Sequence, residues 1–314
     1  MPTLTPTAIL GDIVAAVAVQ SPFLGRIASD FTAEPLKKGQ TAIAHVASRP
    51  SVIDYDAAEG YGESAAETSS LFADRSVVIN RHKHVPIKLS YLSTLTDQKD
   101  VYNHAIMEAA ASLGKAVVDD GLALALDANF SQKTIETVAN TDRDTLGSIR
   151  KAMNKVGALT TGRTALVNSD VFESLAADPR IASSDYYGQQ PGEEALGMLR
   201  NVAGFGQILE YPDLPANGEN LTGVALDPRA MCIKTGIPND MQAMQADLGI
   251  PSIANIETIT DPDSGLTLMG IFWQTPGTFD LMMSVTLMWG WSVGSDGGAD
   301  GALLDYAGHR LVTA

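Results

Sequence analysis

A single long amphipathic helix constrains the fold of this chain more than any other segment. Thr96 or Asp97 can cap the start of a helix, and small and apolar residues then recur at spacings of three and four, as on a buried helix face. This stripe consists of Val101, Ile106, Ala109, Ala110, Leu113, Val117, Gly121 and Leu124. About 25 residues at 1.5 Å each make a rod of roughly 38 Å. Such a rod can brace a flat, elongated subunit.

An acidic segment precedes the long helix. Residues 54–74 are rich in Asp, Glu, Gly and Ala and hold few large apolar side chains, too few to form a core of their own. The flanking residues 41–46 and 75–89 alternate in polarity, which predicts strands. We therefore expect an extended hairpin or loop that protrudes between two strands, with an ordinary surface loop as the simpler alternative.

The first residues predict a short amphipathic arm. Thr5 and Pro6 suit an N-cap and a first helical position. Apolar residues then share one helix face up to Pro22, namely Ile9, Leu10, Ile13, Val14 and Val17. This stripe can fold back onto its own domain, or the tether at residues 34–39 can let it dock elsewhere.

Shorter elements alternate after the long helix. Helices are predicted at 144–156, 170–177 and 193–201. Strands are predicted at 163–168, 207–211, 221–225 and 230–235. This mixture indicates a compact α/β domain inserted after the rod. A hairpin is predicted over residues 253–271 and a strand over 279–293. These strands must return to pair with earlier strands, because an isolated hairpin is only marginally stable.

The charge balance limits the partners of the chain. Its 21 Lys and Arg against 37 Asp and Glu give a net charge of −16, which disfavours gripping nucleic acid through its phosphates. Copies of the chain repel one another at low ionic strength, so self-assembly needs apolar burial or opposed local patches. The single cysteine, Cys232, excludes an internal disulfide and fits a reducing cytoplasm. We expect neither a signal peptide nor a membrane span, since Asp12 interrupts the early apolar run and residues 281–293 are too short.

One motif points to an enzyme. Gly290, Ser292 and Gly294 match the G-x-S-x-G pattern of serine hydrolases. That pattern needs a helix directly after the serine, but a Gly-rich stretch follows here, and only the last 22 residues remain to supply an acid and a base. We therefore predict no catalytic residue, and a cytoplasmic serine hydrolase using Ser292 stays as an alternative.

Neither a metal nor a cofactor is expected. His82 and His84 lie two apart and share one strand face, but no third ligand stands at a recognised spacing. Residues 261–265 contain two Asp and one Gly, yet they lack the later ligands of a calcium loop and suit a hairpin turn instead.

The order of these segments resembles the major capsid protein of tailed bacteriophages. The resemblance rests on the acidic segment, the strand that follows it, the long helix, and the stretches 164–175, 206–215 and 221–234. It implies the α+β HK97-like capsid fold, which encapsulins share. The implied domains are an N-terminal arm (1–36), an extended loop with its strands (37–84), a peripheral domain with the spine helix (85–128), an inserted α/β axial domain (129–265), and return strands of the peripheral domain with the C-terminus (266–314).

The resemblance implies a structural role. A protein of this family assembles with itself into hexamers and pentamers of an icosahedral virion shell, made in the host cytoplasm, that encloses DNA without specific binding. Scaffolding, portal and decoration proteins are further partners, and an encapsulin-type compartment is the alternative. No Lys lies between Lys38 and Lys83, so we expect no isopeptide cross-link from the loop. We also expect a separate scaffold or none, because the arm starts almost at once.

Three groups of residues are predicted to make the contacts between subunits. The arm would contribute its apolar stripe, Ile9, Leu10, Ile13, Val14 and Val17. The loop would contribute Asp54, Asp56, Glu59, Glu63 and Glu67, and a neighbouring copy would answer with Arg81, Lys83 and Lys88.

Overall fold

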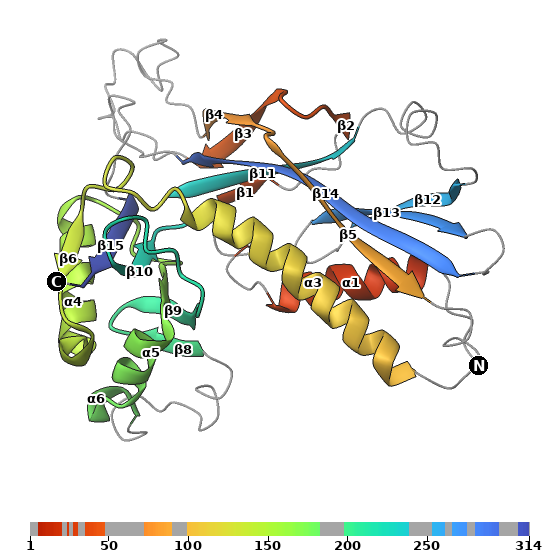
Figure 1. Cartoon of the computed structure of the whole chain (residues 1–314). Coiled ribbons are helices and arrows are strands. Elements are labelled where there is room, and N and C mark those ends of the chain that lie inside the picture. Colours follow the sequence, from red (N-terminus) through yellow and green to blue (C-terminus); the bar gives the residue numbers. More distant parts are fainter. Residues whose placement is uncertain are drawn as a thin grey trace, which may run out of the picture.

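The computed structural model describes residues 6–20, 24, 28–30, 35–47, 72–89, 99–182, 198–238, 253–260, 266–274, 280–294 and 307–313. The strands of these residues form three sheets, of seven, six and two strands. Figure 1 shows the six-stranded sheet on the left and the seven-stranded sheet on the right, with the long helix α3 running from one to the other. The N-terminus and the C-terminus lie at opposite ends of the molecule.

The seven-stranded sheet is built around one long strand, β14 (Leu281–Val293). On one side β14 pairs antiparallel with β5 (Arg81–Leu89), and on the other with β13 (Thr267–Gln274) and β11 (Met231–Pro238). The remaining strands lie at the margins, where β12 (Ile253–Thr260) extends β13 and the short β1 (Ala28–Asp30) and β2 (Pro35–Leu36) run parallel to β11. This sheet therefore gathers strands from very distant parts of the chain.

Helix α3 (Lys99–Leu122) is the predicted rod. Its 24 residues span about 36 Å. The predicted stripe is buried along it, at Ile106, Ala109, Ala110, Leu113 and Val117. At Gly121 an added Cβ would lie 2.8 Å from the ring of Trp291, whose Nε1 donates to Val117 O at 3.0 Å. The helix therefore approaches β14 closely where the sequence has a glycine.

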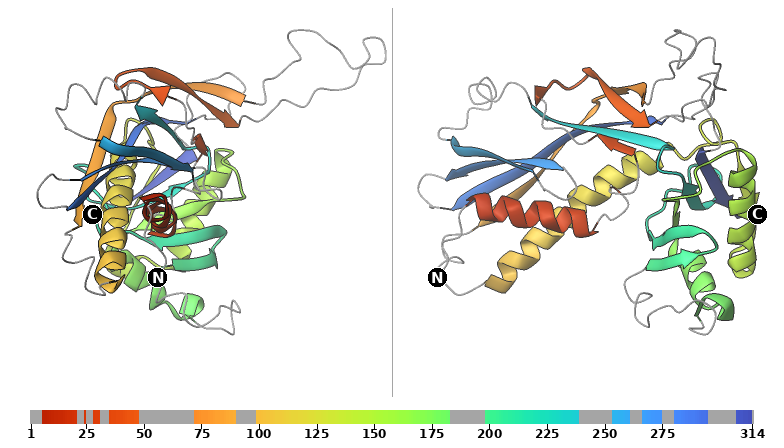
Figure 2. Two further views of the ribbon diagram at one scale, coloured as in Figure 1. Left: turned by 90° about the vertical axis from the view of Figure 1, so that its right-hand side faces the viewer. Right: turned by 180° about the vertical axis from the view of Figure 1, so that it is seen from behind.

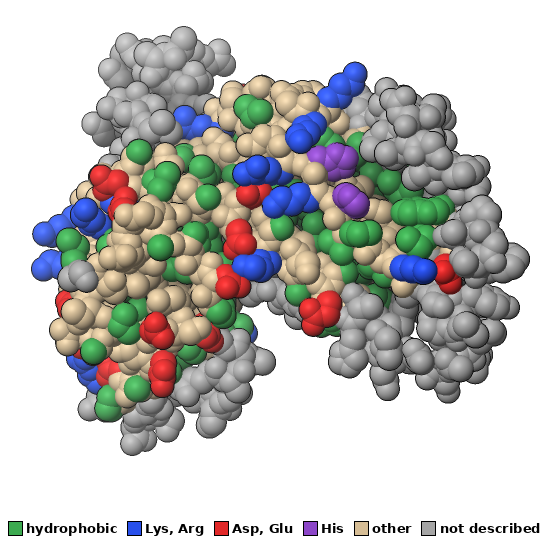
Figure 3. All heavy atoms as spheres, viewed as in Figure 1, with side chains coloured by type: hydrophobic (Ala, Val, Ile, Leu, Met, Phe, Trp, Pro, Cys, Tyr) green, Lys and Arg blue, Asp and Glu red, His purple; other side chains and the backbone are tan. Residues whose placement is uncertain are grey.

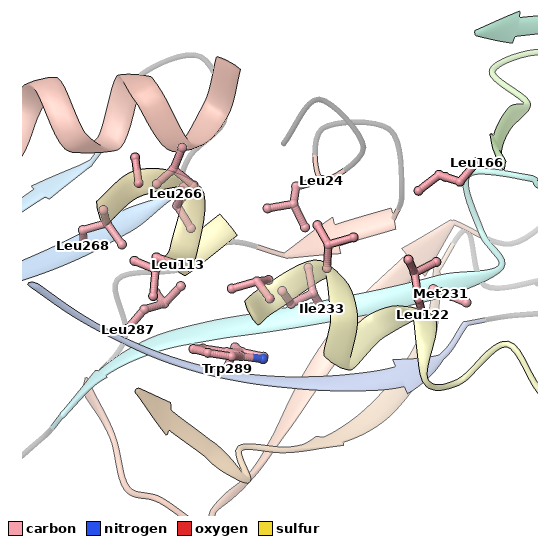
Figure 4. Close-up of a cluster of buried hydrophobic side chains, with 14 of the residues drawn as sticks. Leu24, Leu113, Leu122, Leu166, Met231, Ile233, Leu266, Leu268, Leu287 and Trp289 are labelled. Carbon is pink, nitrogen blue, oxygen red and sulfur yellow. The ribbon is translucent and has the colours of Figure 1, made fainter. Parts of the chain in front are cut away.

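Helix α1 (Pro6–Gln20) crosses α3 and packs against β12 and β13 (Figure 2). Leu10, Ile13, Val14 and Val17 of its stripe are buried in the same core as α3. That core continues through Leu113, Leu287 and Trp289 to the far end of the sheet (Figure 4). Of the two arrangements open to the arm, the chain shows the one in which the arm folds back onto its own domain.

A two-stranded hairpin, β3 (Thr41–Ala47) and β4 (Phe72–Val78), packs across the seven-stranded sheet. The single strand predicted over 75–89 is wrong: β4 pairs with β3, whereas β5 pairs with β14. The chain bends at Ile79, whose N–H donates to Gln40 O at 2.9 Å and whose carbonyl accepts from Gly39 N at 2.7 Å. This crossing is possible because Gly290 has no side chain, since a Cβ there would collide with Val78 O.

The six-stranded sheet has the order β6-β15-β10-β7-β9-β8. Its strands are β6 (Lys133–Ile135), β7 (Thr164–Val167), β8 (Met198–Val202), β9 (Phe205–Glu210), β10 (Leu221–Leu226) and β15 (Gly308–Val312). Helices α4 (Arg143–Lys155) and α5 (Ser169–Ala176) share one apolar cluster with this sheet. Two short turns of helix, η2 (Val138–Asn140) and α6 (Pro179–Ala182), accompany them.

Both helices of this half begin at polar caps. The Asp142 side chain accepts from the N–H groups of Asp144 and Thr145 at 3.0 Å each, and Thr145 Oγ1 returns the bond in a capping box. Asn168 caps α5 by accepting from Val171 N at 3.0 Å. These caps fix the starts of helices that the sequence pattern placed within one residue.

The helix predicted over 193–201 is wrong where the structure describes it. Residues 198–202 form β8, which runs antiparallel to β9. Leu199 and Val202 are fully buried, and the tight turn at Ala203 and Gly204 uses positive φ angles of 51° and 91°. Pairing across this turn outweighs local helix preference.

Strand pairing divides the chain differently from the predicted boundaries. The C-terminal strand β15 inserts between β6 and β10 instead of returning to the peripheral domain. Strands β11 and β12, predicted within the axial domain, belong to the seven-stranded sheet. The chain therefore crosses between the sheets after Leu226 and again before Gly308. The sheet to which each strand belongs is set by its pairing with distant strands, and not by its position in the sequence.

Candidate functional site

Ser292 does not occupy a nucleophile elbow. It lies inside β14, paired with Cys232 of β11, and its Oγ donates to the adjacent Val293 O at 3.4 Å. The strand continues through Val293 without the sharp turn that exposes a catalytic serine. The one histidine that follows it in the sequence, His309, belongs to the other sheet and bonds to Thr134 Oγ1 at 2.8 Å. The described residues therefore bring no base to Ser292.

His82 and His84 form hydrogen bonds with side chains of the neighbouring strand. His82 Nε2 hydrogen-bonds to Thr286 Oγ1 at 2.9 Å, and His84 Nδ1 to Ser284 Oγ at 3.0 Å. Burial, followed by the charges of Lys38 and His84, lowers the pKa of His82. Among the described residues no group of three or more His, Cys, Asp or Glu could hold a metal ion.

Three predicted contact residues lie along β5, with Arg81 and Lys83 on one face of the strand and Lys88 on the other. This β5 stripe consists of Arg81, Lys83 and Lys88, whose side chains are each about half exposed. Figure 3 shows Lys and Arg side chains gathered along this strand. Edge strands often carry such charges, which prevent unwanted strand pairing.

Each member of the β5 stripe has a carboxylate partner in its own chain. Asp120 Oδ2 lies 3.1 Å from Arg81 Nε and 4.0 Å from Lys83 Nζ, and it also accepts from Trp289 Nε1 at 3.1 Å. Lys88 Nζ lies 2.9 Å from Asp280 Oδ2. The stripe is therefore accessible but largely neutralised within the subunit.

The other predicted contact residues differ in what the structure says of them. Leu10, Ile13, Val14 and Val17 are buried against their own subunit, which leaves almost no surface for a neighbour, and the side chain of Ile9 is not described. The acidic set lies outside the described residues, namely Asp54, Asp56, Glu59, Glu63 and Glu67.

The outer face of the β3–β4 hairpin exposes two apolar side chains. Ile43 is 53% exposed and Val78 47%, while the opposite face of the hairpin is buried against the seven-stranded sheet. His45 Nδ1 and Asp74 Oδ1 form a cross-strand pair at 2.7 Å on the same outer face. The sequence signal was available, since Ile43 is the apolar residue out of place on the polar face of the alternating strand.

Sequence reasoning also missed a basic groove along α4. This α4 groove is open, has a volume of about 590 Å³, and is lined by Arg143, Asp144, Gly147, Ser148, Arg150, Lys151, Asn154, Lys155 and Ala203. Four of these residues are basic, all within one helix of 13 residues. The cluster is visible in the sequence, but only the structure shows that these side chains surround a hollow.

Polar contacts lock the end of α3 to the six-stranded half. Asn217 Nδ2 donates to Leu122 O and Ala125 O at 3.0 Å each. Tyr211 OH donates to Asp119 Oδ1 at 2.5 Å, and burial, followed by that carboxylate, raises the pKa of Tyr211. The rod therefore braces both sheets.

A buried arginine completes this junction. Arg310 of β15 is fully buried and pairs with Asp127 and Glu219, and its Nε donates to Phe130 O at 2.6 Å. These three partners lie in the turns next to the end of α3 and before β10. No helix among the described residues is both long and apolar enough to span a bilayer.

Comparison with known proteins reveals likeness in structure only. No family model matches the chain, and no curated protein matches it. Many solved structures resemble it, and three of them, described next, do so over nearly its whole length. A chain from the capsid of the cyanophage P-SCSP1u has a TM-score of 0.51 and 13% identity, covering 90% of this chain and 86% of its own. A chain from a Pyrococcus furiosus virus-like particle has a TM-score of 0.51 and 8% identity, covering 97% and 98%. A chain of the Microbacterium phage Oxtober96 has a TM-score of 0.50 and 10% identity, covering 94% and 91%.

These likenesses establish the fold. The coverage extends over both sheets and the helix that joins them. The α+β HK97-like capsid fold predicted from the sequence is therefore confirmed.

Proposed function

We propose that this chain, which has the fold of capsid and virus-like-particle chains, is a structural major capsid protein that assembles into the icosahedral shell around a phage genome. The observation that carries the proposal is the extent of the likeness, 90% of this chain against the cyanophage capsid. If the likeness were confined to one sheet, this chain could share a single common domain with an otherwise unrelated protein. The architecture extends the argument, because a rod that braces two sheets suits a plate-like subunit.

In this proposal the acidic residues from Asp54 to Glu67, which lie outside the described residues, meet the β5 stripe of the next copy. The exposed side chains of Ile43 and Val78 add apolar contact. Each exposed ion pair contributes little, of order 0–1 kcal/mol, and a shell repeats the pair many times. Head-to-tail contacts of this kind close into rings, so hexamers and pentamers form without covalent bonds.

The wider setting is that of a virion. The shell is assembled in the host cytoplasm, encloses DNA without reading its sequence, and recruits scaffolding, portal and decoration proteins. The chain needs no catalytic residue, metal or cofactor for this role. Loop-derived isopeptide cross-links are absent, because no lysine lies between Lys38 and Lys83.

An encapsulin-type compartment is the second candidate. The Pyrococcus furiosus virus-like particle favours it, because its TM-score of 0.51 equals that of the cyanophage capsid and its coverage is higher. A compartment of this type would hold a protein cargo and no genome. Nuclease-protected DNA in particles purified from the native source would favour the capsid, and a co-purifying enzyme without DNA would favour the compartment.

Deleting residues 56–69 tests the proposed contact. The deletion should leave a folded subunit with unchanged helix content that assembles poorly. A matched variant keeps the length and replaces Asp54, Asp56, Glu59, Glu63 and Glu67 by Asn or Gln, which separates the role of charge from that of the chain itself. Normal shells from both variants, seen by negative-stain microscopy, would remove this segment from the contact.

A further inference from the structure

We propose that the α4 groove is an inter-subunit contact that receives an acidic surface of a second copy of this chain. The proposal rests on the proposed function, since it names a further contact of the same shell. It concerns a different helix and a different sheet from the β5 stripe.

In the part of the chain that the structure describes, the cations of the β5 stripe are neutralised, whereas three cations of the α4 groove are not. The three members of the β5 stripe each have a carboxylate within 4.0 Å in their own chain. Among the described residues, Arg150, Lys151 and Lys155 have no carboxylate within that distance. Unpaired charge is the feature that a partner can complement, so the α4 groove offers more to a second copy than the β5 stripe does.

Asp144, the acid that lines the groove, is already paired. Asp144 Oδ2 is held by Arg180 Nη1 at 2.8 Å, and Arg180 also pairs with Asp142 and Asp178. In this network the carboxylates at the start of α4 pair with Arg180 and not with the cations farther along the helix. The cations farther along α4 therefore keep a net positive charge.

The α4 groove has an open floor and a cationic wall. Gly147 and Ser148 form a low floor between the long side chains, and an added Cβ at Gly147 would meet nothing within 4 Å. Arg150 lies over Gly204 in the turn between β8 and β9 and forms one wall. The result is a recess with cationic walls that can accept a projecting carboxylate side chain or acidic turn.

An acidic surface of a second copy suits the α4 groove by its charge. The chain carries a net charge of −16 in spite of these cations, so a second copy brings carboxylates in excess. The same net charge disfavours a polyphosphate, whose binding depends on a surplus of Lys and Arg. It also repels a second copy over long distances, so the contact depends on a local match of opposite charges. A ring of head-to-tail contacts requires two different complementary surfaces on each copy, and a basic recess facing an acidic projection meets that requirement and fixes the register.

The first test changes the floor of the groove. Gly147→Glu places a carboxylate among the cations, and Gly147→Ala is the matched control that adds a methyl group into open space. We expect Gly147→Ala to assemble like the wild type, and Gly147→Glu to reduce the protein recovered in shells at least tenfold while circular dichroism stays unchanged. Equal assembly of the two variants would contradict the proposal.

The second test detects coverage of the groove and does not depend on the charge reversal. Ser148→Cys introduces an exposed thiol into the groove, and the native Cys232 gives little background because it is 1% exposed. We expect maleimide labelling at position 148 to be at least tenfold slower in shells than in dissociated subunits, including shells emptied of nucleic acid.

The remaining outcomes separate the two proposals. Equal labelling rates in shells and subunits would overturn this inference and leave the proposed function standing. Protection that disappears in nucleic-acid-free shells would overturn it in favour of nucleic acid in the groove. A wild-type protein that forms no shells would overturn the proposed function, and this inference with it.

Discussion

The two sheets of this molecule bury charge in different ways. The core around α1, α3 and the seven-stranded sheet is a continuous apolar cluster that runs from Leu10 to Trp289. Within the described residues, the three buried arginines all belong to the six-stranded half or the turn that leaves it, namely Arg163, Arg229 and Arg310. The seven-stranded half buries one lysine, Lys234 of β11, and Asp280 next to β14. Arg163 donates to the carbonyl of Ala158 at 2.9 Å, and Arg229 Nη2 donates to the buried Asp227 at 2.8 Å.

This difference shows what each half depends on. An apolar core loses stability gradually as its side chains are truncated. A buried ion network is stabilising only when every member is satisfied, and removing one member leaves the others without a partner. The seven-stranded half should therefore tolerate conservative changes that the junction at Arg310 does not.

The largest expected effect is at that junction. Arg310→Met removes the group that joins β15 to Asp127, Glu219 and Phe130 O. We expect the free energy of unfolding to fall by about 3–5 kcal/mol, because the mostly buried Glu219 carboxylate and Phe130 O lose their partner, while the exposed Asp127 returns to water. Urea unfolding measures this, and a loss below about 1 kcal/mol would mean that the two halves do not differ as described.

The next effect is in the apolar core of the other half. Leu113→Ala, at a position 2% exposed on α3, should cost about 3 kcal/mol through lost burial and a cavity. Met107→Ala on the same helix is the control, because Met107 is 43% exposed and surface changes usually stay within about 0.5 kcal/mol. Equal losses from the two substitutions would show that α3 is not buried along the face described.

The six-stranded half should also lose stability in acid, because it buries a histidine. His309 of β15 is buried, its Nδ1 has no partner among the described residues, and burial lowers its pKa from 6.5 to about 4. As the pH falls, the histidine is therefore protonated in the unfolded chain before it is protonated in the folded one. Its contribution to the free energy of unfolding is complete above about pH 6.5 and is lost as the pH falls from about 6.5 to about 4, by at most roughly 3 kcal/mol. His309→Gln should reduce that loss in urea titrations across the window. A variant that loses as much stability as the wild type would show that other groups carry the acid sensitivity.

The smallest effects come from one substitution made in both halves. Gly121→Ala in α3 pushes a methyl group against the Trp291 ring and should destabilise by about 1–2 kcal/mol. Gly147→Ala in α4 meets open space and should stabilise by roughly 1 kcal/mol, because alanine is the better helix former. Thermal unfolding should therefore shift in opposite directions for the two variants, and shifts of the same sign would contradict the packing at one of these sites.

The sequence predicted what depends on local patterns. The long helix, the arm and the capped helices α4 and α5 follow from apolar spacing and capping residues close together in the chain. The hairpin of β12 and β13 follows from its turn-forming residues. The overall order of these elements was enough to indicate the capsid fold.

What the sequence did not predict depends on distant partners. The bend at Ile79 requires Gly290 more than two hundred residues away to lack a side chain, and β15 finds its place only between β6 and β10. Arg310 was not singled out, because its partners are 91 and 183 residues away. The α4 groove was missed because a run of basic residues does not reveal which of them surround a hollow.

The central claim is that this chain builds a closed shell from many copies. The most direct test is multi-angle light scattering with negative-stain microscopy. It uses purified protein at high concentration, a supplied scaffold protein, and about 0.15 M salt to screen the net charge. The account predicts closed icosahedral particles of megadalton mass. A stable monomer or dimer under those conditions would contradict it.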